Sequence, residues 1–167
     1  SDTEVLLYSF VKWGERCVNK FNGMWAFAIW DSFEKKLFLS RDRMGEKPLF
    51  FAFENNKFIF ASEQKAILPL LNRVEVSKNF SFLVQNPYLY EGTEHSLFNK
   101  IFRFPAATNG WLVDGKLTKY KYWNILESRQ ENLNSYKDQT DELRELLHDS
   151  TKIRMRSDVP IGTGLSG

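Results

Sequence analysis

Seven consecutive apolar residues constrain the fold of this chain more than any other feature. The run is Met24-Trp25-Ala26-Phe27-Ala28-Ile29-Trp30, with turn-forming Asn22-Gly23 before it and a polar stretch at 31–35 after it. A short continuous apolar run between turn residues is typical of a strand that is covered on both faces. We therefore expect 24–30 to form an interior strand with a layer on each side.

Local signals predict the neighbouring elements. Ser1 and Glu4 have the spacing of a capping box, and the apolar face that follows them ends at Gly14. Asn55-Asn56 and Asp114-Gly115 each separate two strand-like runs, because both dipeptides tolerate the positive φ of a hairpin turn. We expect strands at 37–39, 49–53, 58–61, 111–113 and 117–122, helices at 64–68 and 79–85, and an irregular excursion over the rest of 76–105.

The composition changes over 124–137, which is polar and carries little apolar content. An amphipathic helix over 138–156 follows, and then a short apolar strand and a turn with glycines at 162, 164 and 167. Small residues after a strand let backbone N–H groups approach a phosphate, but this turn matches neither GxxxxGK[ST] nor GxGxxG. The turn has no second half, so we expect the chain to be a piece of a larger protein.

Composition and charge exclude several classes of function. Hydrophobic residues make up 43% and aromatic residues 16%, which is enough for a packed core, and the net charge of +2 is spread without a basic stripe for nucleic acid. No apolar run approaches the ~20 residues of a membrane span. The single cysteine, Cys17, suits a reducing compartment and a buried structural role. His95 and His148 lie far apart in the sequence and do not suggest a metal site.

Three stretches carry polar side chains that could form a site, and each also has a structural explanation. Asp2 at a helix start could bind a ligand or complement the helix dipole. The charged crossover Arg41–Leu49 could serve a site or form a solvated turn. Ser62 stands where a helix N-cap is expected.

Taken together, these stretches resemble the glutamine-dependent asparagine synthetase family, which joins a class II glutaminase domain to an ATP-pyrophosphatase-type synthetase domain. The matching strings occur in the family's order along the whole chain. They are Ser1–Val5, Asn22–Ala28, Arg41–Leu49, Ala61–Glu63, and Ser157–Pro160 with Leu165–Gly167.

The resemblance implies an α+β fold in two parts. The first, over 1–123, would be part of a four-layer αββα glutaminase domain of the N-terminal-nucleophile type. A linker over 124–137 would lead to the first helix and strand of an α/β synthetase domain over 138–167.

The resemblance also implies roles for individual residues. Asp2 matches the aspartate that holds the α-ammonium of bound glutamine. Leu165, Ser166 and Gly167 match the start of the loop that binds ATP. The family strings around Arg41, Asp42, Ser62 and Glu63 imply no particular chemistry, and we expect these residues to pack between the two domains.

Parts of the family's machinery have no counterpart in this sequence. The family nucleophile is an N-terminal cysteine, whose thiolate attacks the glutamine amide, and Cys17 does not match it. The arginine and the Asn-Gly-Glu segment of the glutamine pocket are also missing, since no Glu follows Asn22-Gly23. The Mg²⁺ ligands are missing too. We expect no catalytic or metal-binding residue here and no activity from the chain alone.

For the complete protein, the resemblance implies an ATP-dependent, glutamine-hydrolysing asparagine synthetase. Glutamine would release ammonia, ATP-Mg²⁺ would activate aspartate as an acyl-adenylate, and ammonia would displace AMP. The expected partners are glutamine, aspartate and ATP, without nucleic acid or membrane; the expected location is the cytoplasm, and a homodimer is compatible with the sequence.

Two alternatives remain open at this point. One is a related enzyme with a different acceptor, such as a β-lactam synthetase-like or natural-product amidating enzyme. The other is a non-catalytic, aromatic-rich β-sheet module, which predicts exposed aromatic side chains along a groove.

Overall fold

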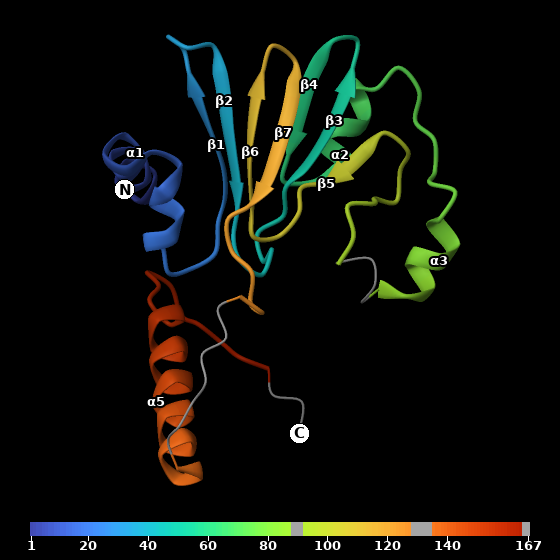
Figure 1. The fold of residues 1–167 in the computed structure, drawn as a ribbon. Coiled ribbons are helices and arrows are strands. Elements are labelled where there is room, and N and C mark those ends of the chain that lie inside the picture. Colours follow the sequence, from blue (N-terminus) through green and yellow to red (C-terminus); the bar gives the residue numbers. More distant parts are fainter. Residues whose placement is uncertain (88–91, 128–134, 165–167) are drawn as a thin grey trace. The chain divides into compact units, whose positions relative to one another are not determined.

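The computed structural model describes residues 1–87, 92–127 and 135–164, which fall into two compact units, Ser1–Ser128 and Arg129–Gly167. The first unit is α+β, and the described part of the second contains the helix α5 (Tyr136–Arg154). Figure 1 shows both units along the chain. Each is a body of its own and is treated separately below.

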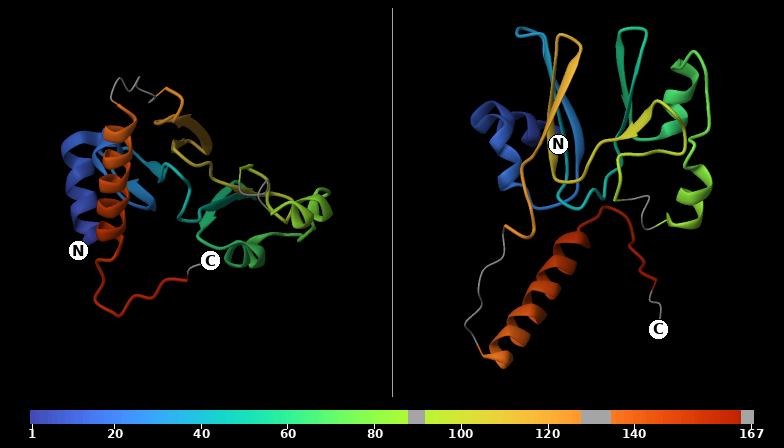
Figure 2. Two further views of the ribbon diagram at one scale, coloured as in Figure 1. Left: turned by 90° about the horizontal axis from the view of Figure 1, so that it is seen from below. Right: turned by 45° about the vertical axis from the view of Figure 1, so that its right-hand side comes forward.

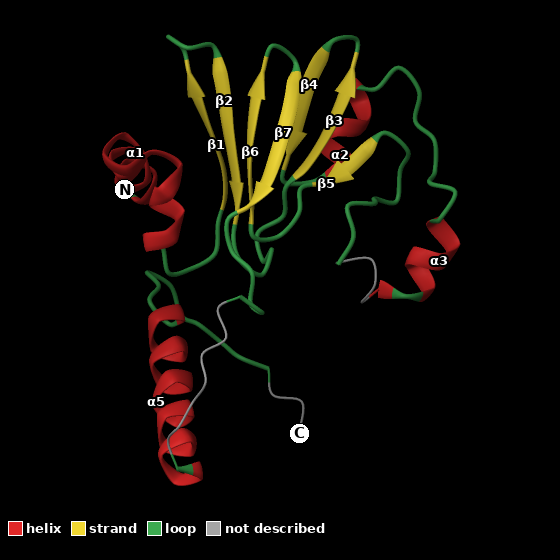
Figure 3. Ribbon diagram, viewed as in Figure 1, coloured by secondary structure: helices red, strands yellow, loops and turns green. Residues whose placement is uncertain are grey.

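The strands described in the first unit form two antiparallel sheets (Figure 3). Sheet A has the order β1-β2-β6-β7 and sheet B the order β4-β3-β5. The strands of sheet A are β1 (Ala26–Asp31), β2 (Lys36–Arg41), β6 (Thr108–Val113) and β7 (Lys116–Lys121). Those of sheet B are β3 (Phe50–Glu54), β4 (Lys57–Ala61) and β5 (Ile101–Arg103). In sequence, all of sheet B is therefore inserted between β2 and β6.

Helical segments cover the outer face of each sheet. On sheet A lie α1 (Asp2–Trp13) and η1 (Gly14–Lys20), and Cys17 and Val18 of η1 are fully buried there with Trp25. On sheet B lie α2 (Gln64–Ile67) and η2 (Leu68–Leu70), where Ile67 is fully buried against β3 and β5. The short helix α3 (Phe80–Gln85) follows in the excursion toward β5. Figure 2 shows α1 beside sheet A and α2 beside sheet B from two further directions.

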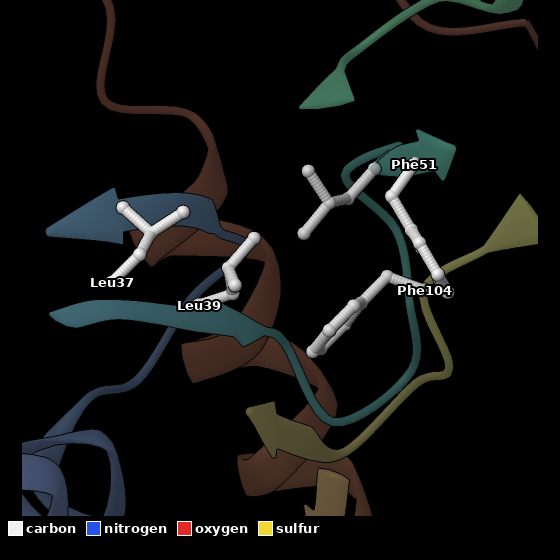
Figure 4. Packing of buried hydrophobic residues seen from close by; sticks show 5 residues of the cluster. Leu37, Leu39, Phe51 and Phe104 are labelled. Carbon is white, nitrogen blue, oxygen red and sulfur yellow. The ribbon is translucent and has the colours of Figure 1, made fainter. Parts of the chain in front are cut away.

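The core between the two sheets is built from alternate residues of facing strands. Leu37 and Leu39 of β2 meet Phe51 of β3 and Phe104, which follows β5 (Figure 4). The intervening Phe38 points to the other face of sheet A, where its ring centroid lies 5.0 Å from that of Phe10 in α1. This period of two lets β2 supply both interfaces at once. The order of layers is therefore α1 with η1, sheet A, sheet B, and α2 with η2.

Predictions that rested on local signals are confirmed. Ser1 caps α1 in a capping box with Glu4, and Gly14 follows its last residue. Asn55 and Asn56 connect β3 to β4 with φ of 50° and 59°, and Asp114-Gly115 connects β6 to β7 with φ of 48° and 75°. The helix expected at 79–85 is α3.

The prediction of an interior strand over 24–30 is wrong. Its strand, β1, lies at the edge of sheet A, and the side chains of Met24 and Trp30 are 44% and 55% exposed. The doubly buried strand is β2, which has a neighbour on each side and a layer on each face. An apolar run indicates that a strand has apolar surroundings, but it does not show where the strand lies in its sheet. It therefore could not show that β2, and not β1, is the interior strand.

The strand expected near the end of the chain is not formed in the described residues 157–164. A strand needs a partner for its backbone N–H and C=O groups, and the second unit presents α5 alone in its described part. The helix itself confirms the expectation for 138–156, beginning two residues earlier at Tyr136. Its apolar residues remain exposed; they are Leu143, Leu146, Leu147 and Ile153.

A carboxylate at the junction of α1 and η1 fixes this segment to sheet A. Glu15 accepts a hydrogen bond from the indole Nε1 of Trp111 at 2.7 Å, and it also bonds the hydroxyl of Tyr120. The hydrogen bond from Tyr120, followed by that from Trp111, lowers the pKa of Glu15 below its ordinary value of 4.5. The ionised carboxylate therefore stabilises the attachment of η1.

We expect Glu15→Gln to lower the melting temperature at neutral pH, because a charge-assisted acceptor becomes a neutral one. A lowered folded pKa gives stability that is complete above about 4.5 and is lost as the pH falls through the folded value. Thermal melting of both proteins across pH 3–8 should show a difference that shrinks in acid. A constant difference would mean that the charge of Glu15 contributes nothing.

The inter-sheet core depends on Phe104, which is fully buried. Phe104→Ala should lower the free energy of unfolding by about 3–5 kcal/mol, because it removes apolar contacts and leaves a cavity. Phe33→Ala is the matched control, since that side chain is 89% exposed. Urea unfolding of the two variants measures both changes, and equal losses would refute the placement of Phe104.

Candidate functional site

A groove of about 740 Å³ runs along the free edge of β1. Its lining comes from four separate segments of the first unit: the start of α1, the β1 region, the crossover after β2, and the end of β4. The lining residues are Asp2, Thr3, Leu6, Leu7, residues 24–30, Lys47, Pro48 and Ser62. The groove therefore brings together parts of four of the stretches selected from the sequence.

Asp2 lies in the first turn of α1 and is exposed to this groove. The helix is capped by Ser1 instead, whose Oγ accepts a hydrogen bond from the backbone N–H of Glu4 at 3.4 Å. The Asp2 carboxylate makes no hydrogen bond or ion pair with any residue that the structure describes. Because capping is done by its neighbours, this negative charge is available to a ligand.

The groove offers a second charge of opposite sign. Lys47 and Asp2 both line it, and most of the remaining lining side chains are apolar. Hydroxyl groups of Thr3 and Ser62 add hydrogen-bonding capacity. A lining of this kind suits a small zwitterion that carries an ammonium, a carboxylate and a short aliphatic chain.

Asp42 directs the crossover that forms one wall of the groove. Its side chain is 1% exposed, and its two carboxylate oxygens accept four backbone hydrogen bonds of 2.9–3.2 Å. The donors are the N–H groups of Trp25, Met44, Glu46 and Lys47. Asp42 thus joins the start of β1 to the opposite wall of the groove.

Arg41 holds the same crossover by donating hydrogen bonds to backbone carbonyl groups. Its guanidinium donates to the backbone oxygens of Lys47, Phe104 and Gly45 at 2.7, 2.6 and 2.5 Å. We expected Arg41 and Asp42 to pack between two domains. The structure buries both inside the first unit instead, with Arg41 4% exposed, because their hydrogen-bonding groups close a local turn.

Ser62 and Glu63 also differ from expectation. Glu63, not Ser62, occupies the N-cap position of α2, and no side-chain hydrogen bond caps that helix. Ser62 lines the groove, whereas Glu63 forms an exposed ion pair with Lys65 at 2.6 Å. The N-cap prediction was wrong by one residue: α2 begins at Gln64, so the extended backbone that precedes the helix falls on Glu63, with φ of −130° and ψ of 139°, and not on Ser62.

Cys17 has the structural role expected from its surroundings. It is fully buried in the cluster with Val18 and Trp25, and burial raises the pKa of its thiol. A high pKa disfavours the thiolate that nucleophilic attack needs. Within the described residues there is also no group of three or more His, Cys, Asp or Glu side chains that could hold a metal ion.

The second unit contributes no comparable site in its described part. A hollow of about 630 Å³ there is bounded by residues of α5 and by Met155, which follows it, so it is one exposed helix face. The predicted ATP-binding residues Leu165, Ser166 and Gly167 lie outside the described residues.

Comparison with known proteins decides the family. The glutamine amidotransferase domain matches residues 1–123, which include the whole groove. The chain belongs to this family.

Its relatives among curated proteins are longer. It is 38% identical to asparagine synthetase [glutamine-hydrolyzing] 3 and 32% identical to asparagine synthetase [glutamine-hydrolyzing] 1, both of Bacillus subtilis. It is 29% identical to asparagine synthetase B [glutamine-hydrolyzing] of Escherichia coli. Each alignment covers 100% of this chain but only 27%, 26% and 25% of the relative. This amidotransferase domain chain thus spans about a quarter of their length.

The binding-module alternative predicted exposed aromatic residues along a groove, and Trp30 does line one. Family membership, and not burial, is therefore what favours the amidotransferase. No helix within the described ranges has the length and apolarity needed to cross a membrane.

Proposed function

We propose that this chain supplies part of the glutamine-binding site of a glutamine-hydrolysing asparagine synthetase. The observation that carries the proposal is the Asp2 carboxylate, which faces the groove while Ser1 and Glu4 cap its helix. Family membership over 1–123 gives the class of substrate. Asp2 would pair with the α-ammonium of glutamine.

The side chains that line the groove support the same ligand. Glutamine is a zwitterion with a short aliphatic chain, and the lining presents a carboxylate and an ammonium among apolar side chains. The fold that we propose for the complete domain is the four-layer glutaminase of the N-terminal-nucleophile type. The buried Cys17 thiol does not serve as the nucleophile, so amide cleavage needs a cysteine outside this sequence.

The remainder of the reaction belongs to the complete protein. There, ATP would activate the β-carboxylate of aspartate as an acyl-adenylate, with loss of pyrophosphate. Ammonia would then attack the carbonyl carbon and release AMP. The relatives' names favour aspartate as acceptor over a β-lactam precursor or a natural product. We propose a cytoplasmic location, where ATP and reduced thiols are available.

The chain contributes only the start of the second half-reaction. Leu165, Ser166 and Gly167 would place backbone N–H groups near the phosphates of ATP. Mg²⁺ would accompany ATP, and we propose that its ligands come from the remainder of the complete protein.

Replacing Asp2 in the complete protein tests the glutamine site. Asp2→Ala should raise the KM for glutamine roughly ten- to a hundredfold, since a charge-assisted hydrogen bond is worth about 1.5–3 kcal/mol. Amide synthesis from ammonium chloride should stay nearly intact, because ammonia bypasses this site. Steady-state kinetics with each nitrogen source measures both effects.

Ser1→Ala is the matched control, because it removes the cap of the same helix and leaves the Asp2 charge in place. If Ser1→Ala raises the KM as much as Asp2→Ala does, Asp2 acts through the helix alone. Equal loss of both activities in a folded Asp2→Ala protein would also refute the assignment.

Gly167→Val tests the proposed nucleotide turn. A β-branched side chain at this position should block the approach of the backbone to the phosphates and abolish synthesis from glutamine and from ammonia alike. Glutamine hydrolysis without ATP should continue, which controls for folding. Retention of ammonia-dependent synthesis would disprove the nucleotide assignment.

A further inference from the structure

We infer that Asp42 is a positioning residue for the groove that contains Asp2, with Arg41 as its partner in that role. The identity of the ligand, glutamine, rests on the proposed function. The hydrogen bonds that carry the inference do not depend on it. Neither side chain is among those expected to touch glutamine. Both fix the backbone that the groove is made from.

Asp42 connects two walls of the groove that are far apart in sequence. One carboxylate oxygen, Oδ2, accepts from the N–H of Trp25 at 3.2 Å and from the N–H of Lys47 at 3.0 Å. Trp25 and Lys47 both line the groove. In the opposite direction, the N–H of Asp42 donates to the carbonyl of Trp25 at 2.9 Å. One side chain therefore sets the spacing between the β1 region and the crossover.

The other oxygen and the backbone of Asp42 shape the crossover itself. Oδ1 accepts from the N–H groups of Met44 and Glu46, and the carbonyl accepts from Gly45 and Ala107. These bonds coil residues 43–47 tightly around the carboxylate. The turn then delivers Lys47 and Pro48 to the groove.

Gly45 shows how closely the crossover is packed. Its φ is +68°, and a Cβ placed there would lie 3.0 Å from the Cβ of Ala106 and 3.1 Å from Cζ of Arg41. The turn can thus close only around glycine, with the Arg41 guanidinium against it. Arg41 then bonds the carbonyls of Gly45 and Lys47, so the pair holds both the N–H and the C=O side of the turn.

Further contacts in the same region fix the wall of the groove that contains Trp25. The indole Nε1 of Trp25 donates to Oγ of Ser40 at 3.0 Å, and its ring stacks on Tyr122 with centroids 6.2 Å apart. The hydroxyl of Tyr122 donates to the carbonyl of Arg41 at 3.0 Å. Ser40 and Tyr122 thus hold the Trp25 side chain in place. The Asp42 carboxylate links the Trp25 backbone to Lys47 on the opposite wall.

Asp42→Asn is the sharpest test, because it keeps the volume and removes half of the acceptor capacity. One of its two polar atoms becomes a donor and faces backbone N–H groups. In the complete gene product, we expect the KM for glutamine to rise about tenfold to a hundredfold, since small misplacements of binding groups have effects of this size. Ammonia-dependent synthesis should be unchanged.

Asp31→Asn is the matched control. Asp31 also accepts backbone N–H bonds in a turn, from Phe33 and Glu34 at 3.0 and 2.9 Å, but it does not line the groove. It should leave the KM for glutamine within about twofold of the wild type. If Asp42→Asn does not fold, Arg41→Lys replaces it, because a lysine can reach only one of the three carbonyls at a time.

A second readout is independent of glutamine. In the 167-residue chain, amide hydrogen exchange of Glu46 and Lys47 should be faster in Asp42→Asn or Arg41→Lys than in the wild type, with the protection of sheet A preserved. We call the hydrogen bonds of Asp42 and Arg41 to the crossover residues 43–47 the clamp. Unchanged exchange at these amides would refute the clamp whatever the enzyme kinetics show.

The outcomes separate this inference from the proposed function. Should Asp2→Ala raise the KM for glutamine while Asp42→Asn leaves it unchanged, the positioning role is refuted and the glutamine site stands. Should Asp2→Ala have no effect while exchange at Lys47 accelerates in Asp42→Asn, the clamp stands and the ligand assignment fails. A KM increase in both variants, with Asp31→Asn like the wild type, supports both.

Discussion

The carboxylate of Asp42 is the constraint on which the site depends. It is buried, and four backbone N–H groups replace the water that an ionised carboxylate would otherwise hold. Burying a charge is costly unless it is hydrogen-bonded, so the chain adopts the turn that satisfies it. That turn brings Lys47 to the groove, and the same carboxylate ties Trp25, which precedes β1, to the crossover. Arg41 satisfies carbonyls of the same turn, so the pair specifies both sides of one short segment.

Sequence reasoning predicted the elements whose causes are local. Hairpins at Asn55-Asn56 and Asp114-Gly115 follow from residues that accept positive φ, and the capping box follows from the spacing of Ser1 and Glu4. The strand β5 had no such signal, because its three residues are fixed by pairing with a distant strand: Ile101 pairs with Ala52, and Arg103 pairs with Phe50. The same limit explains β1: its apolar run was recognised, but its edge position depends on which strands pair with β2.

The site was predictable only in part. Asp2 was selected through family resemblance, and its position at a helix start agreed equally well with complementation of the helix dipole; the structure adds that Asp2 lines the groove while Ser1 and Glu4 cap the helix. Ser62 was selected for the wrong reason, as an N-cap. Arg41 and Asp42 were noticed for their charge, but no pattern around them indicated that both side chains would turn inward toward backbone groups. Hydrogen bonds between a side chain and backbone groups do not require particular residue types as partners, so they cannot be recognised from the sequence.

The insertion of sheet B between β2 and β6 has a consequence for the order of assembly. β2 is buried on both faces and along both edges, yet its partner β6 begins 67 residues after the end of β2, since β2 ends at Arg41 and β6 starts at Thr108. At a synthesis rate of about 5–20 residues per second, β2 waits roughly 3 to 13 seconds for that partner to be made. During this interval the β3–β4 hairpin can form and pack on it. The β3–β4 part of sheet B can thus cover the most buried strand of sheet A until sheet A is complete.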